Sequence, residues 1–318
     1  MKTTFRLLLL PFLLIGAAVL LQAQTPAVNH NTWTSGAAMP TPVVEPGGAA
    51  VLKNEIYVVG GMNSEGAIVA DTQIYNPATN SWSTAAPLPT PTLDAAAAVV
   101  KNILYLIGGT TSGGTTNAVW AYNPKTNTWS GKAAMPTVRD SIGAVVKSNI
   151  IYVIGGEDSG TRLTTVESYN PATNSWTEEQ PLLVGKSEPT IGLVGTTIVA
   201  ADGYTSSNDT GDNEGCNVTT NTWESLKSDP TARNTAFGAG IGAELYVIGG
   251  YQGGGPGSPA LTLNEAFKVS KNSWTTLAPM PQAAMFGASA VYKGQLYCIG
   301  GWSSFHGTTI GNVQIYQP

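Results

Sequence analysis

The chain has 318 residues, of which 42% are hydrophobic and only 11% are charged, against about 25% charged residues in ordinary soluble domains. Its 15 basic and 20 acidic residues give a net charge of −5, which argues against the basic surface that binds nucleic acid. Two cysteines and two histidines are too few for a disulfide scaffold or for a cysteine-rich or multi-histidine metal site. We therefore expect no metal and no cofactor.

The first segment of the chain is typical of a secretory signal peptide. Lys2 and Arg6 precede an apolar run over residues 7–21, and Gln22-Ala23-Gln24 follows it. This run is shorter than the ~20 residues that a transmembrane helix needs. We expect residues 1–23 to be removed, leaving a secreted or periplasmic protein with no membrane span in the mature chain. A retained membrane anchor is the alternative.

The rest of the chain is an internal repeat. Paired glycines recur at Gly60, Gly108, Gly155, Gly249 and Gly300, with Asp202-Gly203 in the remaining place, at spacings of 48, 47, 47, 47 and 51 residues. A tryptophan follows each of the first five, at Trp82, Trp129, Trp176, Trp223 and Trp274. Two independent markers that hold one register indicate a repeat architecture.

Each repeat predicts four short strands. In the first repeat, apolar strands over residues 49–52 and 56–59 end at the glycine pair. A third strand ends at Tyr75, a turn covers residues 76–80, and a fourth strand begins at residue 81. Short apolar runs between turn residues fit strands that are covered on both faces. A four-stranded unit repeated every ~47 residues predicts an all-β propeller.

The repeats resemble those of the kelch family. The resemblance rests on the consecutive glycines, on the Tyr-Asn-Pro-x-Thr-Asn-x-Trp pattern of residues 75–82, and on a following Met-Pro pair such as Met135-Pro136. It covers roughly residues 31–318. The family implies a β-propeller whose variable loops carry the function.

The two ends of the repeat region predict six blades and a closed ring. The last repeat stops after Tyr316, without a fourth strand, whereas the region begins with a lone fourth strand around Trp33. Pairing these segments removes an exposed sheet edge. We expect a propeller over residues 24–318, with a closing strand at 31–36 and blades at about 41–85, 88–132, 135–179, 182–226, 229–277 and 280–318.

Candidate binding residues occupy the position after each glycine pair, where loops emerge on one face of a propeller. The residues there are Met62, Thr110, Glu157, Tyr204, Tyr251 and Trp302. The last three form a predicted aromatic arc, because aromatic faces suit sugar rings or peptide side chains. The alternative is that these rings pack beneath their own loops. His306, in the last long loop, is a further candidate ligand and a possible acid or base.

A second set of candidates stands where the chain enters each inner strand, and we expect it around the mouth of the central channel. The set comprises Glu45, Asp94, Arg139 with Asp140, Lys186 with Glu188, Arg233, and Met285 with Phe286. Arg139, Lys186 and Arg233 would form a basic arc able to hold a carboxylate. The alternative is a ring of solvated residues that pair with one another.

These patterns favour a secreted, non-catalytic, monomeric recognition module that binds a protein segment or a glycan over the channel mouth. One alternative is a surface subunit. Another comes from a resemblance to secreted bacterial kelch proteins that are sialic-acid epimerases, where Glu45, Asp94, Asp140 and Glu188 would transfer protons and arginines would bind the substrate carboxylate. The copper radical oxidases that some kelch propellers form need two histidines, two tyrosines and a cysteine. Beyond its first few residues the mature chain has one histidine, His306, which argues against that chemistry here.

Overall fold

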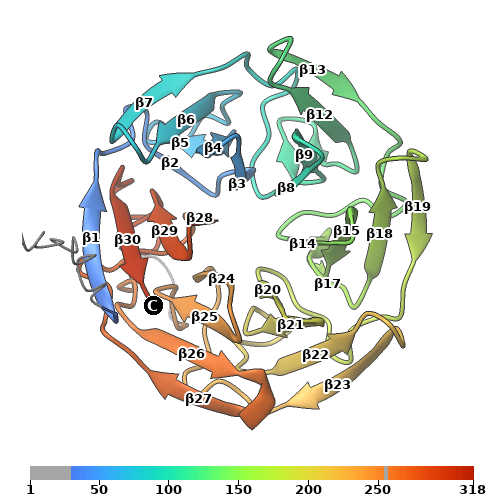
Figure 1. The fold of residues 1–318 in the computed structure, drawn as a ribbon, viewed down its shortest axis with the longest axis vertical. Coiled ribbons are helices and arrows are strands. Elements are labelled where there is room, and N and C mark those ends of the chain that lie inside the picture. Colours follow the sequence, from blue (N-terminus) through green and yellow to red (C-terminus); the bar gives the residue numbers. More distant parts are fainter. Residues whose placement is uncertain (1–29, 254–256) are drawn as a thin grey trace, which may run out of the picture.

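The computed structural model describes residues 30–253 and 257–318. Within these ranges, six antiparallel four-stranded sheets surround a central axis as the blades of a propeller (Figure 1). The expected all-β fold with six blades is confirmed, and the helical structure in the described ranges is one 3-10 turn, η1 (Val269–Lys271). The predicted signal peptide, residues 1–23, lies outside the described residues.

The first three blades follow one another along the chain, each from its inner to its outer strand. Blade one comprises β3 (Gly48–Leu52), β4 (Glu55–Val59), β6 (Thr72–Asn76) and β7 (Ser81–Thr84). Blade two comprises β8 (Ala96–Val100), β9 (Ile103–Ile107), β12 (Val119–Asn123) and β13 (Thr128–Gly131). Blade three comprises β14 (Gly143–Lys147), β15 (Ile150–Ile154), β18 (Val166–Asn170) and β19 (Ser175–Glu178).

The last three blades have the same order, except that the outer strand of blade six comes from the start of the propeller. Blade four comprises β20 (Thr190–Val194), β21 (Thr197–Ala201), β22 (Asn213–Asn217) and β23 (Thr222–Leu226). Blade five comprises β24 (Phe237–Ile241), β25 (Glu244–Ile248), β26 (Asn264–Lys268) and β27 (Ser273–Thr276). Blade six comprises β28 (Ala288–Tyr292), β29 (Gln295–Ile299), β30 (Val313–Gln317) and β1 (Thr32–Gly36).

Strand β1 closes the ring as expected. It pairs antiparallel with β30, with Trp33 opposite Tyr316. The two rings lie 5.0 Å apart between centroids, and Trp33 Nε1 donates a hydrogen bond of 2.9 Å to the carbonyl of Ala278. Because this pairing joins the two ends of the propeller, blade six has no unpaired outer edge on β30.

The repeated tryptophans bind neighbouring blades together. Each indole N–H donates to a backbone carbonyl just after the outer strand of the preceding blade, at 2.7 to 2.9 Å. An asparagine with positive φ, such as Asn80 in blade one, accepts from the tyrosine hydroxyl of its own blade and from the N–H of that same linker residue. These repeated residues are therefore scaffold.

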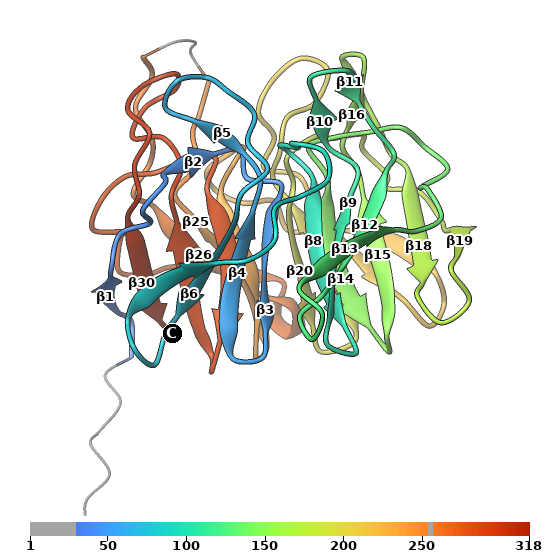
Figure 2. The same ribbon diagram turned by 90° about the horizontal axis from the view of Figure 1, so that it is seen from above.

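The two ends of the propeller differ in their loops. Figure 2 shows that the short strands β2 (Val43–Val44), β5 (Met62–Asn63), β10 (Thr110–Thr111), β11 (Gly114–Thr115) and β16 (Glu157–Asp158) gather at one end; β17 (Thr161–Arg162) pairs with β16. Tight hairpins between the two innermost strands of each blade lie at the other end. Between the ends, small and aliphatic residues such as Ala50, Val145 and Gly240 line an opening of about 280 Å³.

Candidate ligand-binding site at the channel mouth

Six residues, one from each blade, surround the entrance to the channel at the end with the long loops. Each precedes its inner strand and has a left-handed backbone conformation: Glu45 (φ 47°), Asp94 (φ 49°), Ser141 (φ 53°), Glu188 (φ 55°), Thr235 (φ 55°) and Phe286 (φ 54°). We call these residues the mouth ring. Left-handed conformations are uncommon outside glycine and are costly for a β-branched residue such as Thr235. Such conformations persist only where the surrounding structure enforces them.

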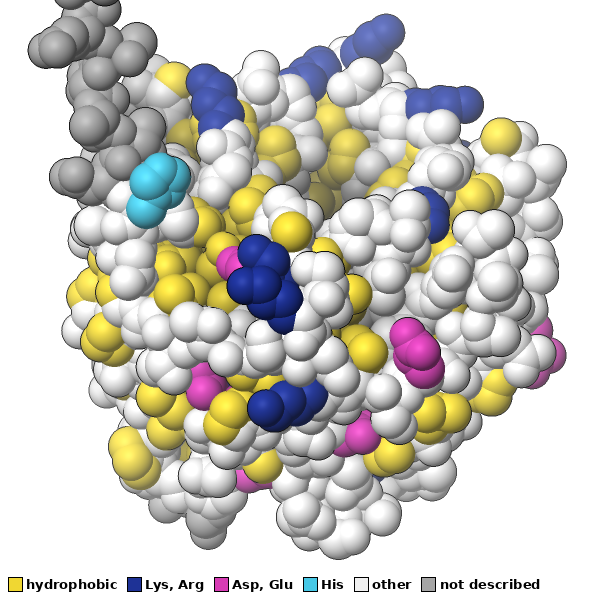
Figure 3. Space-filling model, turned by 60° about the horizontal axis from the view of Figure 1, so that its bottom comes forward, with side chains coloured by type: hydrophobic (Ala, Val, Ile, Leu, Met, Phe, Trp, Pro, Cys, Tyr) yellow, Lys and Arg dark blue, Asp and Glu magenta, His cyan; other side chains and the backbone are white. Residues whose placement is uncertain are grey.

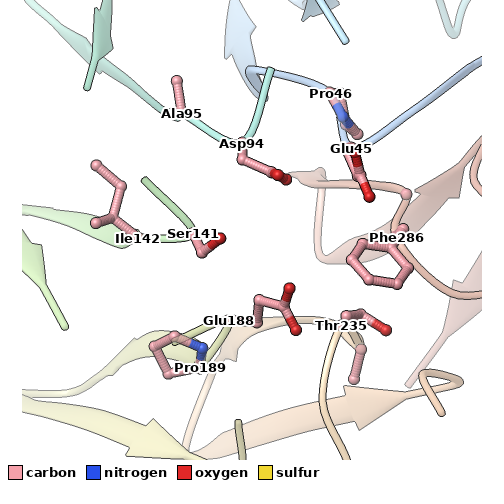
Figure 4. Close-up of a pocket in the computed structure, with 12 residues that line it drawn as sticks. Glu45, Pro46, Asp94, Ala95, Ser141, Ile142, Glu188, Pro189, Thr235 and Phe286 are labelled. Carbon is pink, nitrogen blue, oxygen red and sulfur yellow. The ribbon is translucent and has the colours of Figure 1, made fainter. Parts of the chain in front are cut away.

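Backbone hydrogen bonds between blades hold the mouth ring in place. The N–H of Asp94 donates to the carbonyl of Glu45 at 3.1 Å, and the N–H of Glu45 donates to the carbonyl of Phe286 at 2.9 Å. Three further bonds of this kind run from Ser141 to Asp94, from Glu188 to Ser141 and from Phe286 to Thr235. Because neighbouring blades satisfy these backbone groups, the side chains are left to line the opening (Figure 4).

The mouth ring surrounds a cavity of about 150 Å³, which we call the mouth cavity. Three carboxyl groups face it from different blades, those of Glu45, Asp94 and Glu188 (Figure 4). Ser141 and Thr235 add hydroxyl groups, and Phe286 adds an apolar wall. The arrangement is thus rich in hydrogen-bond acceptors and carries no cationic side chain in its lining.

Burial and mutual repulsion raise the pKa values of these carboxyl groups. Burial, followed by the charge of Asp140, raises the pKa of Glu45 to about 7. Burial, followed by neighbouring carboxylates, raises the pKa of Glu188 to about 8 and that of Asp94 well above its ordinary value. The positive charge of Arg162 opposes this rise and lowers the pKa of Glu188. The ring therefore exchanges protons with solvent near neutral pH.

An aromatic pocket of about 280 Å³ adjoins the mouth cavity and shares Glu188 and Phe286 with it. Its other lining residues are Arg162, Ser187, Tyr204, Asn234, Tyr251 and Phe305. The rings of Tyr251 and Phe305 stack with centroids 5.1 Å apart and planes 6° from parallel. The Arg162 guanidinium lies 4.9 Å from the Tyr204 ring centroid.

Two buried polar atoms beside these cavities have no hydrogen-bond partner among the described residues. They are Thr235 Oγ1, which belongs to the mouth ring, and Asn234 Oδ1, which belongs to a residue of the aromatic pocket. The two residues are 8% and 4% exposed. Since a buried polar atom without a partner costs about 1–3 kcal/mol, these atoms indicate a place where a ligand completes the structure.

The predicted aromatic arc is formed in part. Tyr204 and Tyr251 line the aromatic pocket, but Trp302 is only 7% exposed. Its ring packs edge-on against Phe286 and Phe305. Trp302 therefore supports the loop from beneath, as the alternative interpretation had it.

Glu157 lies 3.1 Å from Arg162 in an ion pair, and His306 is exposed beside Trp302, at 5.2 Å between ring centroids.

The predicted basic arc is wrong as a feature of the channel mouth. Arg139, Lys186 and Arg233 are fully buried. Arg139 contacts Glu167 at 2.8 Å, and Lys186 contacts Asp212 at 2.6 Å. Arg233 contacts three carboxylates, those of Asp202, Asp229 and Glu265. Each cation stands two positions before a mouth-ring residue, and its side chain runs into the blades because a carboxylate partner lies there.

The outcome for the predicted carboxylates is mixed. Glu45, Asp94 and Glu188 line the mouth cavity, whereas Asp140 stands one position before the ring. Asp140 accepts a hydrogen bond of 3.0 Å from the Thr115 hydroxyl and another from Thr110. It therefore acts on the cavity through its charge and not as a lining residue.

Sequence reasoning missed Ser141 and Thr235 on the mouth ring, and Arg162, Ser187, Asn234 and Phe305 in the aromatic pocket. A signal for the first two was present, since the mouth-ring spacings of 49, 47, 47, 47 and 51 residues equal those of the series from Trp33 to Trp274. The charged residues two positions earlier, Arg139 and Arg233, were selected instead. Phe305 had no such signal, because it belongs to a loop that occurs once.

Among the described residues, no group of three or more His, Cys, Asp or Glu side chains is arranged to hold a metal ion. On the face drawn in Figure 3, the Lys and Arg side chains of the described residues stand apart from one another and form no continuous basic patch. No helix in the described ranges is long and apolar enough to cross a membrane.

Comparison with known proteins places this geometry in a family. A model of the KLHDC2/KLHL20/DRC7 kelch-repeats domain matches residues 25–202, more than half of the chain. The chain belongs to the kelch-repeat family. A kelch-motif model also matches residues 237–281. The kelch-repeat propeller suggests a module that binds proteins.

Individual relatives of this kelch propeller share short stretches of sequence. Kelch-like protein 23 of Homo sapiens is 26% identical over 98 residues, and Kelch-like protein 35 of Mus musculus is 31% identical over 98 residues. Each alignment covers 31% of this chain but only 16% of the relative. The solved structure of YjhT is 19% identical, with a TM-score of 0.75 over 88% of this chain and 96% of that one, and it shares the propeller fold.

Proposed function

We propose that this kelch propeller is a non-catalytic recognition module that binds a protein segment across the channel mouth. The observation that carries the proposal is the continuity of two cavities, the mouth cavity and the aromatic pocket, through Glu188 and Phe286. Residues from all six blades contribute to them, so a bound segment would contact several blades. Tyr251 and Phe305 offer stacked rings of the kind that bind with little loss of conformational entropy.

A peptide selection tests this function. Random peptides displayed on phage are selected on the full chain, and the affinity of the selected peptides is then measured for variants. Phe305→Ala is expected to weaken binding about 30-fold, the effect of losing an aromatic hot spot. Tyr292→Ala is the matched control, because Tyr292 ends the inner strand β28 at the opposite end of the channel. Selected peptides that bind Phe305→Ala as well as the wild type would contradict the proposal.

A glycan is the other ligand that an aromatic pocket accommodates, and the family membership favours a protein segment over it. A glycan array probed with the same chain separates the two. Binding to glycans with no peptide selected would reject the protein segment as the ligand.

A sugar epimerase is the second candidate, and one observation favours it. Glu45 and Glu188, with pKa values raised to about 7 and about 8, are suited to exchange protons at neutral pH. The arginines expected to bind a substrate carboxylate, Arg139 and Arg233, are buried in ion pairs, whereas Arg162 lines the adjoining aromatic pocket. Anomer exchange of free sialic acid, followed by NMR, tests the activity, and unchanged exchange in the presence of the protein rejects it.

We also propose that the propeller works after export, in the periplasm or outside the cell. The support is the basic and apolar N-terminal segment with Ala23 at its end. The mass of the protein recovered from the exported fraction gives its first residue. A full-length protein beginning at Met1 would reject removal of the segment.

A further inference from the structure

The mouth cavity has a composition that selects one class of ligand group. Its polar lining consists of the carboxyl groups of Glu45, Asp94 and Glu188, and of hydroxyl groups. Arg162, the cation that acts on Glu188 from the adjoining pocket, is engaged by Glu157 and by the ring of Tyr204. An anionic group would meet repulsion from these carboxyl groups in their ionised form, and an apolar group would leave them without partners.

Thr235 and Asn234 provide a second, independent indication of a ligand. Both are more than nine-tenths buried, and Thr235 Oγ1 and Asn234 Oδ1 have no hydrogen-bond partner among the described residues. The amide nitrogen of Asn234 already donates to Asp209 at 2.6 Å, so its oxygen is left to accept. A donor group in the mouth cavity can satisfy Thr235 Oγ1 together with the ring, and a second donor in the aromatic pocket can satisfy Asn234 Oδ1.

The size of the mouth cavity matches the end of one long side chain. A cavity of about 150 Å³ is known to hold a molecule as large as benzene, and the mouth cavity measures about 150 Å³. Phe286 forms one wall, against which a methylene stem packs or over which a cation lies.

We propose that the mouth ring receives a single lysine or arginine side chain of the bound protein segment, with the rest of the segment lying over the aromatic pocket. This inference rests on the proposed recognition function and names the chemistry of its partner. An ammonium or guanidinium group supplies the charge that the ring lacks, and its N–H groups donate to the carboxylates.

The pH dependence of binding follows from the groups around the cavity. The titratable and charged groups that act on it are Glu45, Asp94, Glu188, Asp140, Glu157 and Arg162. A cation favours the carboxylate form, so its entry releases protons from groups whose pKa lies at about 7 and about 8. Affinity for a cationic segment therefore rises as the pH increases from about 6 to about 9, a range in which lysine stays charged.

Peptide pools with one defined position test the inference on the full chain. Acetylated, amidated pools with random flanking residues and a central Lys, Arg, norleucine or Glu are titrated by fluorescence anisotropy. The Lys and Arg pools are expected to bind about ten-fold tighter than the norleucine pool, as for charged hydrogen bonds, and the Glu pool weakest. Glu188→Gln should remove this preference and flatten the pH dependence. Glu178→Gln, on the exposed outer strand β19, changes the net charge equally and should leave both unchanged.

The outcomes separate this inference from the proposed function. Equal binding of the four pools, lost in Phe305→Ala, would leave a recognition module and overturn the cationic ligand. A preference for Lys and Arg that persists in Glu188→Gln would also overturn it, since the charge would then act elsewhere. Binding of no pool would reject the inference and the proposed function together.

Discussion

Blades three to five and the channel mouth hold charged side chains in opposite ways, although the residues concerned are two positions apart in the sequence. Lys186 and Arg233 are fully buried, yet each meets carboxylates within its surroundings. Glu45 and Glu188 are half-buried and have other carboxyl groups as neighbours instead. Burial, followed by the charges of these neighbours, raises the pKa of both. The difference teaches that charge alone does not mark a site, whereas charge without a partner does.

The largest expected effect that tests this comparison is a loss of stability when Arg233 is replaced. Arg233→Met leaves Asp229, Asp202 and Glu265 without their buried cation. The free energy of unfolding in urea should fall by about 3–5 kcal/mol, the usual cost of removing one partner of a buried ion pair. Arg162→Met, which breaks the partly exposed pair with Glu157, should cost less than about 1 kcal/mol. Equal losses in the two variants would show that burial does not distinguish these pairs.

A smaller effect on stability, a gain instead of a loss, is expected when a carboxyl group of the mouth ring is neutralised. Glu45 and Glu188 hold protons in the folded chain up to about pH 7 and about pH 8, whereas the unfolded chain releases them near pH 4.5. The folded state binds more protons within this window, so its stability is highest at the acidic end and falls as the pH rises. Asp202, whose pKa burial also raises, contributes in the same sense.

Glu188→Gln isolates the contribution of the mouth ring from that of Asp202. At about pH 9 this variant should be more stable than the wild type by about 1 kcal/mol, a value reduced for the half-exposed position of the side chain. Glu178→Gln should match the wild type throughout. If the curves of stability against pH for Glu188→Gln and the wild type superimpose, the raised pKa of Glu188 does not lower the stability of the folded chain at high pH, and this prediction is wrong.

The smallest effect concerns Arg162, the cation that acts on the mouth ring from its edge. Arg162→Gln should raise the pKa of Glu188 further above about 8, because the positive charge that opposes the rise is removed. Glu157→Gln should lower it, since Glu157 is one of the carboxylates that raise it. Titration of ¹³C-labelled glutamate by NMR measures both. Shifts of the same sign in the two variants would contradict the electrostatic account.

The fold was largely predictable from the sequence because its determinants are local and repeated. The repeated tryptophans make the same contact in all six blades, such as Trp82 to Ala37. The turn asparagines contact a tyrosine hydroxyl in the blades that have this tyrosine, such as Asn80 to Tyr75. The lone strand at Trp33 identified the closure for the same reason. Asp202 departed from the glycine pattern because its carboxylate, at a positive φ of 59°, contacts Arg233.

The site was predictable only in part. Glu45, Asp94 and Glu188 were found because they are charged and stand before inner strands. Tyr204 and Tyr251 were found because they follow the glycine pairs. Phe305 could not be predicted, since its contact with Tyr251 joins loops of two blades.

The sequence by itself determined the number of blades, the period and the strand that closes the ring. These features depend on residues that recur at the same position of each repeat and have the same structural role there. Only the tertiary structure decided which charged residues face the channel. A shift of two positions separates Arg233, inside the blades, from Thr235, on the mouth ring. The physical reason is that a charged side chain is buried where a partner from another strand meets it, and no local pattern records that partner.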